Sequence, residues 1–206
     1  MGLIRRSYTY LDITCFLMLY KALVRPHLEY ANQVWAPRLK KYVVALENVQ
    51  RRATKQIPGF KDMEYRDRLE KLSLPTLVYR RLRGDMIELF KILSAKYDKR
   101  VCDFIPLHEG PTRGHPLKIK KEHIKLNKRS ASFVPRSVNV WNSLPCDVVT
   151  APSIQAFERR LDRHWRNEPF RFNFEAQPPG TTTAARHRSA VSHDQDTDTD
   201  LTPEAI

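Results

Sequence analysis

The sequence lacks the short motifs that mark the common enzyme classes. It contains no GxxxxGK[ST] or GxGxxG phosphate-binding loop, no HExxH zinc motif and no GxSxG nucleophile turn. No two aspartates are adjacent anywhere in its 206 residues. Adjacent acids are one way in which a two-metal phosphoryl-transfer site holds its divalent ions. We therefore expect no catalytic residue, no metal site and no cofactor in this chain.

Paired cysteines and long apolar runs are also missing. Cys15, Cys102 and Cys146 lie far apart, which excludes a CxxC pair, and their odd number argues against a disulfide framework. The apolar stretch at residues 11–19 is interrupted by polar side chains and is shorter than the roughly 18 residues of a membrane span. We expect an intracellular protein, nuclear or cytoplasmic, without a membrane partner.

Clusters of metal-binding side chains are not evident from the spacing. His108, His115 and His123 are separated by seven and eight residues, which places them on one face of neither a helix nor a strand. No cysteine stands beside them at ligand spacing, so we interpret them as solvated loop histidines. Carboxylates that could be paired, such as Glu29 with Glu47, are interpreted as surface ion-pairing or capping groups.

What the sequence does have is an excess of positive charge. Lysine and arginine number 36 against 23 aspartates and glutamates, a net charge of +13. From residue 171 onward three arginines face six acids, so this tail carries −3 and the body before it +16. Such a body favours a polyanionic partner, because neutralising phosphates releases condensed counterions. The alternative is that the charges only keep the surface hydrated.

Basic clusters recur along the body, interleaved with the aromatic residues Tyr8, Trp35, Tyr42 and Tyr79. Contacts from Lys and Arg to phosphates, with bases stacked on aromatic rings, are how proteins hold single-stranded nucleic acid. We therefore predict RNA and/or DNA as the partner, bound with low specificity, and leave the oligomeric state open. The candidate binding residues are Arg5, Arg6, Lys21, Arg25, Lys40, Lys41, Arg51, Arg52, Lys55, Arg80, Arg81 and Arg83.

Hydrophobic periodicity predicts a mainly α fold. The clearest amphipathic pattern runs from Leu39 to Ile57, with apolar residues spaced by three and four. Pro26 is expected to end the helix before it and to open the next one. Trp35, Trp141 and Trp165 are interpreted as core anchors. Helices are predicted at 10–24, 26–36, 39–57, 64–72, 76–97 and 137–144, and in a final helix capped by Ser153.

The chain after residue 100 has a different sequence pattern. Apolar and basic residues alternate at 117–121 and 124–126, which together with 132–134 predicts short strands. We therefore divide the chain into a helical array at 1–100, a small α+β segment of hairpin and helices at 101–170, and a tail at 171–206. The tail has few large apolar residues and is predicted to be disordered.

Several longer motifs occur in a fixed order along the chain. YKALVRPHLEYANQVWAPRLKK (20–41) precedes QRRATKQIPG (50–59), which precedes a Y-x-x-R-L-x-x-L-x-L-P-T-L-x-x-R-R-x-R-G-D pattern (65–85). The segment SVNVWNSLPCDVVTAPSIQAFERRLDRHW (137–165) follows. Taken together, residues 1–165 resemble the region downstream of the palm in jockey-like non-LTR retrotransposon reverse transcriptases.

The resemblance implies a place in a larger enzyme. In that family an endonuclease nicks the target DNA, and a palm with metal-binding aspartates copies the RNA. This chain corresponds to the part after those elements. The resemblance therefore implies that residues 1–57 act as a thumb on the template–primer backbone, and that the later region is an element-specific C-terminal domain. The chain would be a fragment of an RNA-directed DNA polymerase that does not catalyse alone.

Three other interpretations stay open. The chain could be part of an active reverse transcriptase whose palm is supplied in trans, which a polymerase assay tests. It could be a co-opted helical protein-interaction module, which binding to an RNA–DNA duplex at several salt concentrations distinguishes. It could also be a truncated retroelement product without a function.

Overall fold

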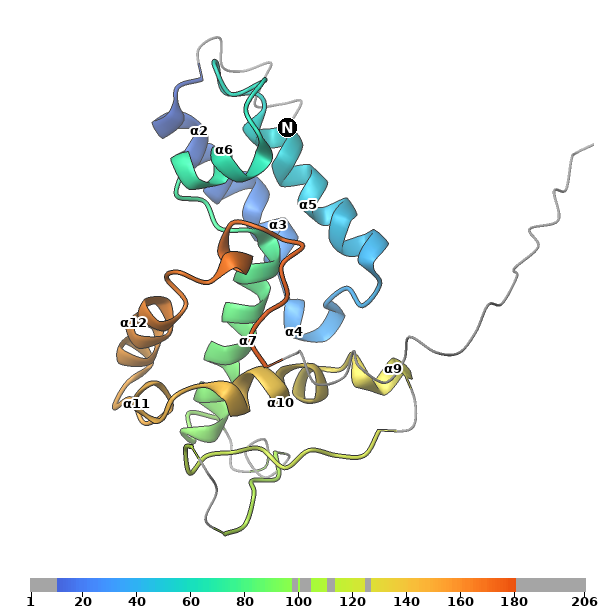
Figure 1. Ribbon diagram of the computed structural model, residues 1–206, viewed down its shortest axis with the longest axis vertical. Coiled ribbons are helices and arrows are strands. Elements are labelled where there is room, and N and C mark those ends of the chain that lie inside the picture. Colours follow the sequence, from blue (N-terminus) through green and yellow to red (C-terminus); the bar gives the residue numbers. More distant parts are fainter. Residues whose placement is uncertain (1–10, 98–99, 101–104, 111–113, 125–126, 181–206) are drawn as a thin grey trace, which may run out of the picture.

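The computed structural model describes residues 11–97, 100, 105–110, 114–124 and 127–180, and these are mainly helical (Figure 1). The prediction of a mainly α fold is therefore confirmed. The first half of the chain consists of α2 (Ile13–Leu19), the π-helical turn η1 (Tyr20–Val24), α3 (Arg25–Glu29), α4 (Asn32–Trp35), α5 (Lys40–Thr54), α6 (Tyr65–Lys71) and α7 (Leu77–Leu93). The second half contains α9 (Asn127–Ser130), α10 (Phe133–Ser143), α11 (Cys146–Val149), α12 (Ile154–His164) and the 3₁₀ turn η2 (Pro169–Arg171).

Pro26 does not end a helix, contrary to the prediction. The helical run passes from α2 through η1 into α3 without leaving the right-handed helical region at Arg25. Because proline has no N–H to donate, the turn before it widens, and the Arg25 N–H donates to the carbonyl of Tyr20, five residues back. The π turn thus accommodates the proline inside a continuous helix.

The predicted α+β segment is not supported, because no strand forms among the described residues. Ser132 is the N-cap of α10, so the strand expected at 132–134 is wrong. Residues 117–121 make only an isolated bridge, between Leu107 and Ile119. The side chain of Asn142 donates to the carbonyl of Ile119 and accepts from its N–H, both at 2.9 Å, in the place of a neighbouring strand. Residues 125 and 126 lie outside the described residues.

Two apolar clusters form the core. One joins α2, η1, α5 and α6 through residues such as Phe16, Tyr20 and Leu69. The other joins α7, α10, α11 and α12 around Trp141 and Trp165. Helix α7, from the segment at 1–100, therefore packs in the same cluster as α10 and α12, from the segment at 101–170 (Figure 1).

The beginning of the predicted disordered tail is ordered in the structure. Phe172 and Phe174 pack against the first cluster, and Ala176 packs against the second. Residues 169–180, called the strap below, therefore run along the molecule from η2 down to α10 (Figure 1). The prediction of disorder is wrong for this stretch, and residues 181–206 lie outside the described residues. No helix in the described ranges is long and apolar enough to cross a membrane.

Candidate nucleic-acid interface

The structure separates the predicted binding cations by exposure. Arg5 and Arg6 lie outside the described residues. The exposed members of the predicted set are Lys21, Lys40, Lys41, Arg52 and Lys55. None of these five has an ion-pair partner in the described part of the chain. Only the exposed cations can meet a ligand without first breaking contacts within the fold.

Three predicted cations are held in ion pairs, two of them between helices. Arg80 of α7 forms a two-point pair with Glu29 of α3, with one contact at 2.8 Å. Arg25 lies 3.8 Å from the same carboxylate. Arg83 contacts Asp162 of α12 at 2.6 Å. Arg80 and Arg83 dock helices together, and none of the three arginines is free to bind a phosphate.

Arg81 and Arg51 are engaged in packing. Arg81 is only 7% exposed, and burial lowers its pKa, although the nearby carboxylate of Glu47 opposes that shift. Arg51 is half-buried, with its guanidinium 5.0 Å from the ring centre of Tyr65 and 5.4 Å from that of Phe174. Removing Arg51 would therefore disturb the core as well as the surface charge.

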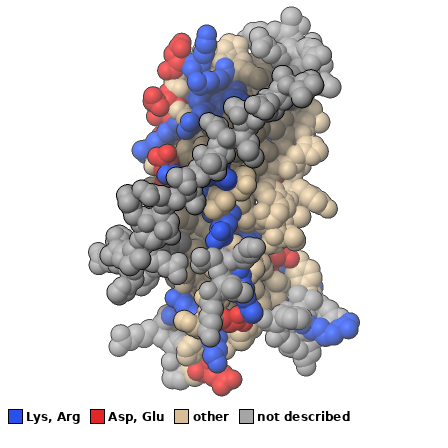
Figure 2. Space-filling model, turned by 90° about the vertical axis from the view of Figure 1, so that its right-hand side faces the viewer, with Lys and Arg blue, Asp and Glu red and all other residues tan. Residues whose placement is uncertain are grey.

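The solvent face of α5 carries cations without exposed acids. With about 100° per residue, Lys40, Lys41, Arg52 and Lys55 fall within an arc of about 120°. Glu47 is the one acid in α5, and its side chain is buried, with 1% exposed. Figure 2 views the side where Figure 1 places α5, and Lys and Arg side chains are visible on it. The positive charge of this face is therefore not neutralised by the helix itself.

Three exposed aromatic residues lie at the N-terminal end of α5. Tyr30 is 79% exposed, Tyr42 54% and Trp35 39%. The Trp35 indole N–H donates to the carbonyl of Tyr30, and the Lys41 ammonium lies 5.2 Å from the ring centre of Tyr42. We call these three aromatic residues, together with the four exposed cations of α5, the α4–α5 surface.

Two of the three tryptophan predictions are confirmed. Trp141 and Trp165 are 0% exposed and are core anchors, as predicted. Trp35 is not a core anchor, because the turn and α4, which carry it, place its side chain toward the solvent. Tyr30 was missed as a candidate, since its sequence neighbours gave no sign that α3 would end one residue before it. The apolar stripe predicted for α5 is buried only in its second half, and Leu39 at its start is 42% exposed.

A buried asparagine explains why the loop turns outward. Ala31 adopts a left-handed conformation with φ of 50°, which reverses the chain between α3 and α4. Asn32 is then buried, and its amide donates to the carbonyl of Arg81 at 3.2 Å and to Asp85 at 3.1 Å. Arg136 of α10 donates to the carbonyls of Asn32 and Gln33. The loop is fixed from inside, which leaves its aromatic side chains facing the solvent.

The two buried carboxylates of the described residues, Glu47 and Asp85, are each held by hydrogen bonds from other residues. Glu47 accepts from the Tyr65 hydroxyl at 2.7 Å and from the backbone N–H of Leu77 at 3.0 Å. Asp85 accepts two hydrogen bonds from Arg136, at 2.9 and 3.0 Å. Burial raises the pKa of both carboxyl groups, while their donors oppose the shift. No group of three or more metal-ligating side chains gathers in the part of the chain that the structure describes.

The histidine prediction is wrong at one position. His108 and His123 are exposed, as expected of solvated loop residues. His115 is 0% exposed, with its ring edge-on to Trp141 at 6.1 Å and its Nε2 3.1 Å from the Trp141 carbonyl. Burial lowers its pKa, so it is a neutral packing residue.

Comparison with known proteins found no matching family model, no matching curated protein and no matching solved structure.

Proposed function

We propose that this chain is a nucleic-acid-binding fragment of a non-LTR retrotransposon reverse transcriptase, which holds a template–primer backbone and does not polymerise by itself. The motif order at 20–165 supports the family, and the α4–α5 surface supports the activity. The observation that carries the proposal is the solvent face of α5, where exposed cations stand without an exposed acid and beside exposed aromatic rings.

The α4–α5 surface suits a phosphate backbone in its dimensions. Lys41 and Lys55 are 14 residues apart on and just beyond one helix, which is about 21 Å along its axis. A duplex strand advances about 3.4 Å per phosphate, so this length corresponds to roughly six phosphates. The aromatic rings at one end can stack on unpaired bases, each worth about 1–3 kcal/mol. The surface therefore fits a duplex that continues into a single strand.

The test is a comparison of two fourfold charge reversals. Lys40, Lys41, Arg52 and Lys55 are changed to Glu in one variant, and Lys61, Lys96, Arg159 and Arg163, which are exposed on other elements, in the control. Binding to an RNA–DNA duplex with a single-stranded overhang is followed by fluorescence anisotropy. We expect the first variant to lose on the order of 100-fold in affinity and its salt dependence to flatten, because about four phosphate contacts are removed. Equal losses in both variants would show that only net charge matters.

The aromatic rings are tested separately. Tyr42→Ala and Tyr30→Ala should weaken binding to a single strand by about 1–3 kcal/mol for each stacked base, and should leave binding to a blunt duplex almost unchanged. A loss of the same size for both ligands would contradict base stacking at this surface. A primer-extension assay on the intact chain tests the other half of the proposal, and nucleotide incorporation would contradict it.

A second candidate function is a helical protein-interaction module. It is favoured by three exposed aliphatic side chains of the first helices: Val34 of α4 is 86% exposed, Met18 of α2 62% and Leu23 of η1 51%. Apolar patches of this kind occur at protein interfaces. Binding to a protein partner that does not change with salt concentration, and that is lost in Val34→Asp, would support this candidate over nucleic-acid binding.

A further inference from the structure

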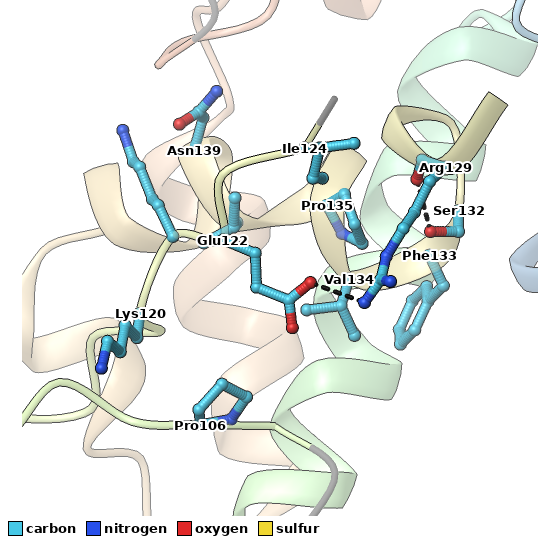
Figure 3. Close-up of a pocket in the computed structure, with 12 residues that line it drawn as sticks. Pro106, Lys120, Glu122, Ile124, Arg129, Ser132, Phe133, Val134, Pro135 and Asn139 are labelled. Carbon is cyan, nitrogen blue, oxygen red and sulfur yellow. Dashed lines mark hydrogen bonds and ion pairs between the residues drawn. The ribbon is translucent and has the colours of Figure 1, made fainter. Parts of the chain in front are cut away.

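An apolar cavity lies between α10 and the segment at 119–124. It has a volume of about 460 Å³, within the range of about 300–1,000 Å³ that ligand sites occupy. Its apolar wall consists of Ile124, Phe133, Val134, Pro135 and Val138. Figure 3 shows Ile124, Val134 and Pro135 around an open space. The cavity is separate from the α4–α5 surface.

The rim of this cavity is positively charged. Lys120, Lys121 and Arg129 line it, against one acid, Glu122. Glu122 and Arg129 face each other across the opening in Figure 3 and form an ion pair at 2.8 Å, with both side chains largely exposed. Lys120 and Lys121 are exposed and have no ion-pair partner among the residues that the structure describes. The cavity therefore suits an apolar group flanked by negative charges.

The strap leaves the described part of the chain beside this cavity. A Cβ added to Gly180 would lie 2.6 Å from the carbonyl oxygen of Asn139 and 3.1 Å from the Ser143 hydroxyl. The backbone at Gly180 is thus pressed against α10, and Asn139 is itself one of the residues that line the cavity. Residues 181–206 follow directly from this point.

The sequence of those residues matches the cavity in charge and polarity. They contain the acids Asp194, Asp196, Asp198, Asp200 and Glu204. Leu201 stands inside that acidic run, with aspartate immediately before it. A leucine flanked by carboxylates is the chemistry that an apolar cavity with a lysine and arginine rim would recognise, since the leucine loses contact with water and the acids meet the cations.

We propose that the acidic C-terminal segment, residues 194–206, binds in this cavity, with Leu201 against Val134 and Val138 and its acids at Lys120, Lys121 and Arg129. Leu201 follows Gly180 by 21 residues, a chain length that reaches across about 25 Å on average, and Gly180 already lies beside the cavity. Attachment gives the segment a high effective concentration, on the order of millimolar, so that a weak contact suffices. The inference is independent of the proposed nucleic-acid binding.

The test uses the full chain with isotope-labelled isoleucine and valine methyl groups. Leu201→Ser removes the proposed anchor, and Val191→Ser is the matched control, because it removes an aliphatic side chain of the same segment outside the acidic run. We expect the methyl resonances of Val134, Val138 and Ile124 to shift in Leu201→Ser and to stay in place in Val191→Ser. The double variant Lys120→Glu, Lys121→Glu should show the same shifts of the Val134 and Val138 methyl resonances as Leu201→Ser.

A peptide of residues 194–206, added to the Leu201→Ser chain, should restore the wild-type resonances, and the same peptide with Leu201→Ser should not. The proposal is overturned if the Leu201→Ser chain keeps the wild-type methyl resonances, or if the two serine variants behave alike. It is also overturned if a single-stranded oligonucleotide restores the resonances and the peptide does not, because the cavity would then be a nucleic-acid site.

Discussion

Partly buried charged residues hold helices of this protein together, and Arg136 is the clearest example. Its guanidinium joins Asp85 of α7 to the carbonyls of Asn32 and Gln33 at the start of α4. Arg81 and Arg83, which the sequence marked as binding residues, have comparable structural roles. Charge alone does not separate a ligand-binding arginine from a packing arginine, because the acid that pairs with it lies 50 or more residues away in most of these cases.

The first prediction at this scale concerns the pair of Arg136 with Asp85. Arg136→Ala should reduce the free energy of unfolding by about 3–5 kcal/mol, because it leaves a carboxylate that is 4% exposed without its cation. Arg129→Ala, which breaks an exposed pair with Glu122, should cost at most about 1 kcal/mol. Urea unfolding measures both. Similar losses in the two variants would mean that Asp85 is not buried as described.

The second prediction concerns the pH dependence set by Glu47. Because burial raises its pKa in the folded protein, folding favours the neutral carboxyl group, and this stabilisation is present below the unfolded value near 4.5. It is lost as pH rises through the folded pKa. Glu47→Gln keeps a neutral group beside Tyr65, so the variant should gain stability relative to the wild type as pH increases from about 4 to 7. A difference that is constant with pH would contradict a raised pKa.

At the scale of elements, two helices end with side chains in an unfavourable backbone conformation. Ser73 after α6 and Ala95 after α7 have φ of 48° and 52°. At each end the same kind of hydrogen bond closes the helix: the Leu74 N–H donates to the carbonyl of Leu69, and the Lys96 N–H donates to that of Lys91. This is the Schellman ending, which glycine fits best because it has no Cβ.

Ser73→Gly and Ala95→Gly should each raise the free energy of unfolding by about 0.5–1 kcal/mol, since they remove the left-handed strain of a side chain. Ala45→Gly, at an exposed position inside α5, is the matched control and should lower it by about 1 kcal/mol. Thermal or urea unfolding gives the signs. Destabilisation in all three variants would argue that the two helices end differently.

The sequence predicts elements well where the information is local. The pattern at 39–57 gives α5, and the Ser153 hydroxyl accepts from the Ala156 N–H at 3.1 Å, as expected of an N-cap. The outward course of α4 is set by Asn32 contacting residues some 50 positions later, and no local pattern contains that information. The exposure of the aromatic residues of the α4–α5 surface was therefore only partly predictable from the sequence, whereas the exposure of the α5 lysines was predictable.

At the scale of the whole molecule, the strap and α7 connect the two apolar clusters. The Thr76 hydroxyl donates to the carbonyl of Phe170, and the Thr76 N–H donates to that of Arg171, both at 2.9 Å. Phe170 packs on Tyr79 and Trp165, with 5.4 Å between ring centres in both pairs. The strap thereby contributes to both apolar clusters of the fold.

Phe170→Ala should lower the free energy of unfolding by about 3–5 kcal/mol, because a fully buried ring leaves a cavity. Phe172→Ala, at a half-buried position, is the control and should cost less. Amide exchange should show α5 and α10 losing protection together in the Phe170 variant, since both clusters depend on the strap. Loss confined to α10 would indicate that the two halves unfold independently.

The bonds from Arg136 to Asn32 and Gln33 also set an order of assembly. The turn that exposes Tyr30 and Trp35 is encoded near the start of the chain, yet two of its carbonyls receive their donor from a residue more than a hundred positions later. During synthesis this turn can reach its final form only after residue 136 has emerged from the ribosome. A nascent chain that carries all of α5 would therefore present its cations before its aromatic residues are in place.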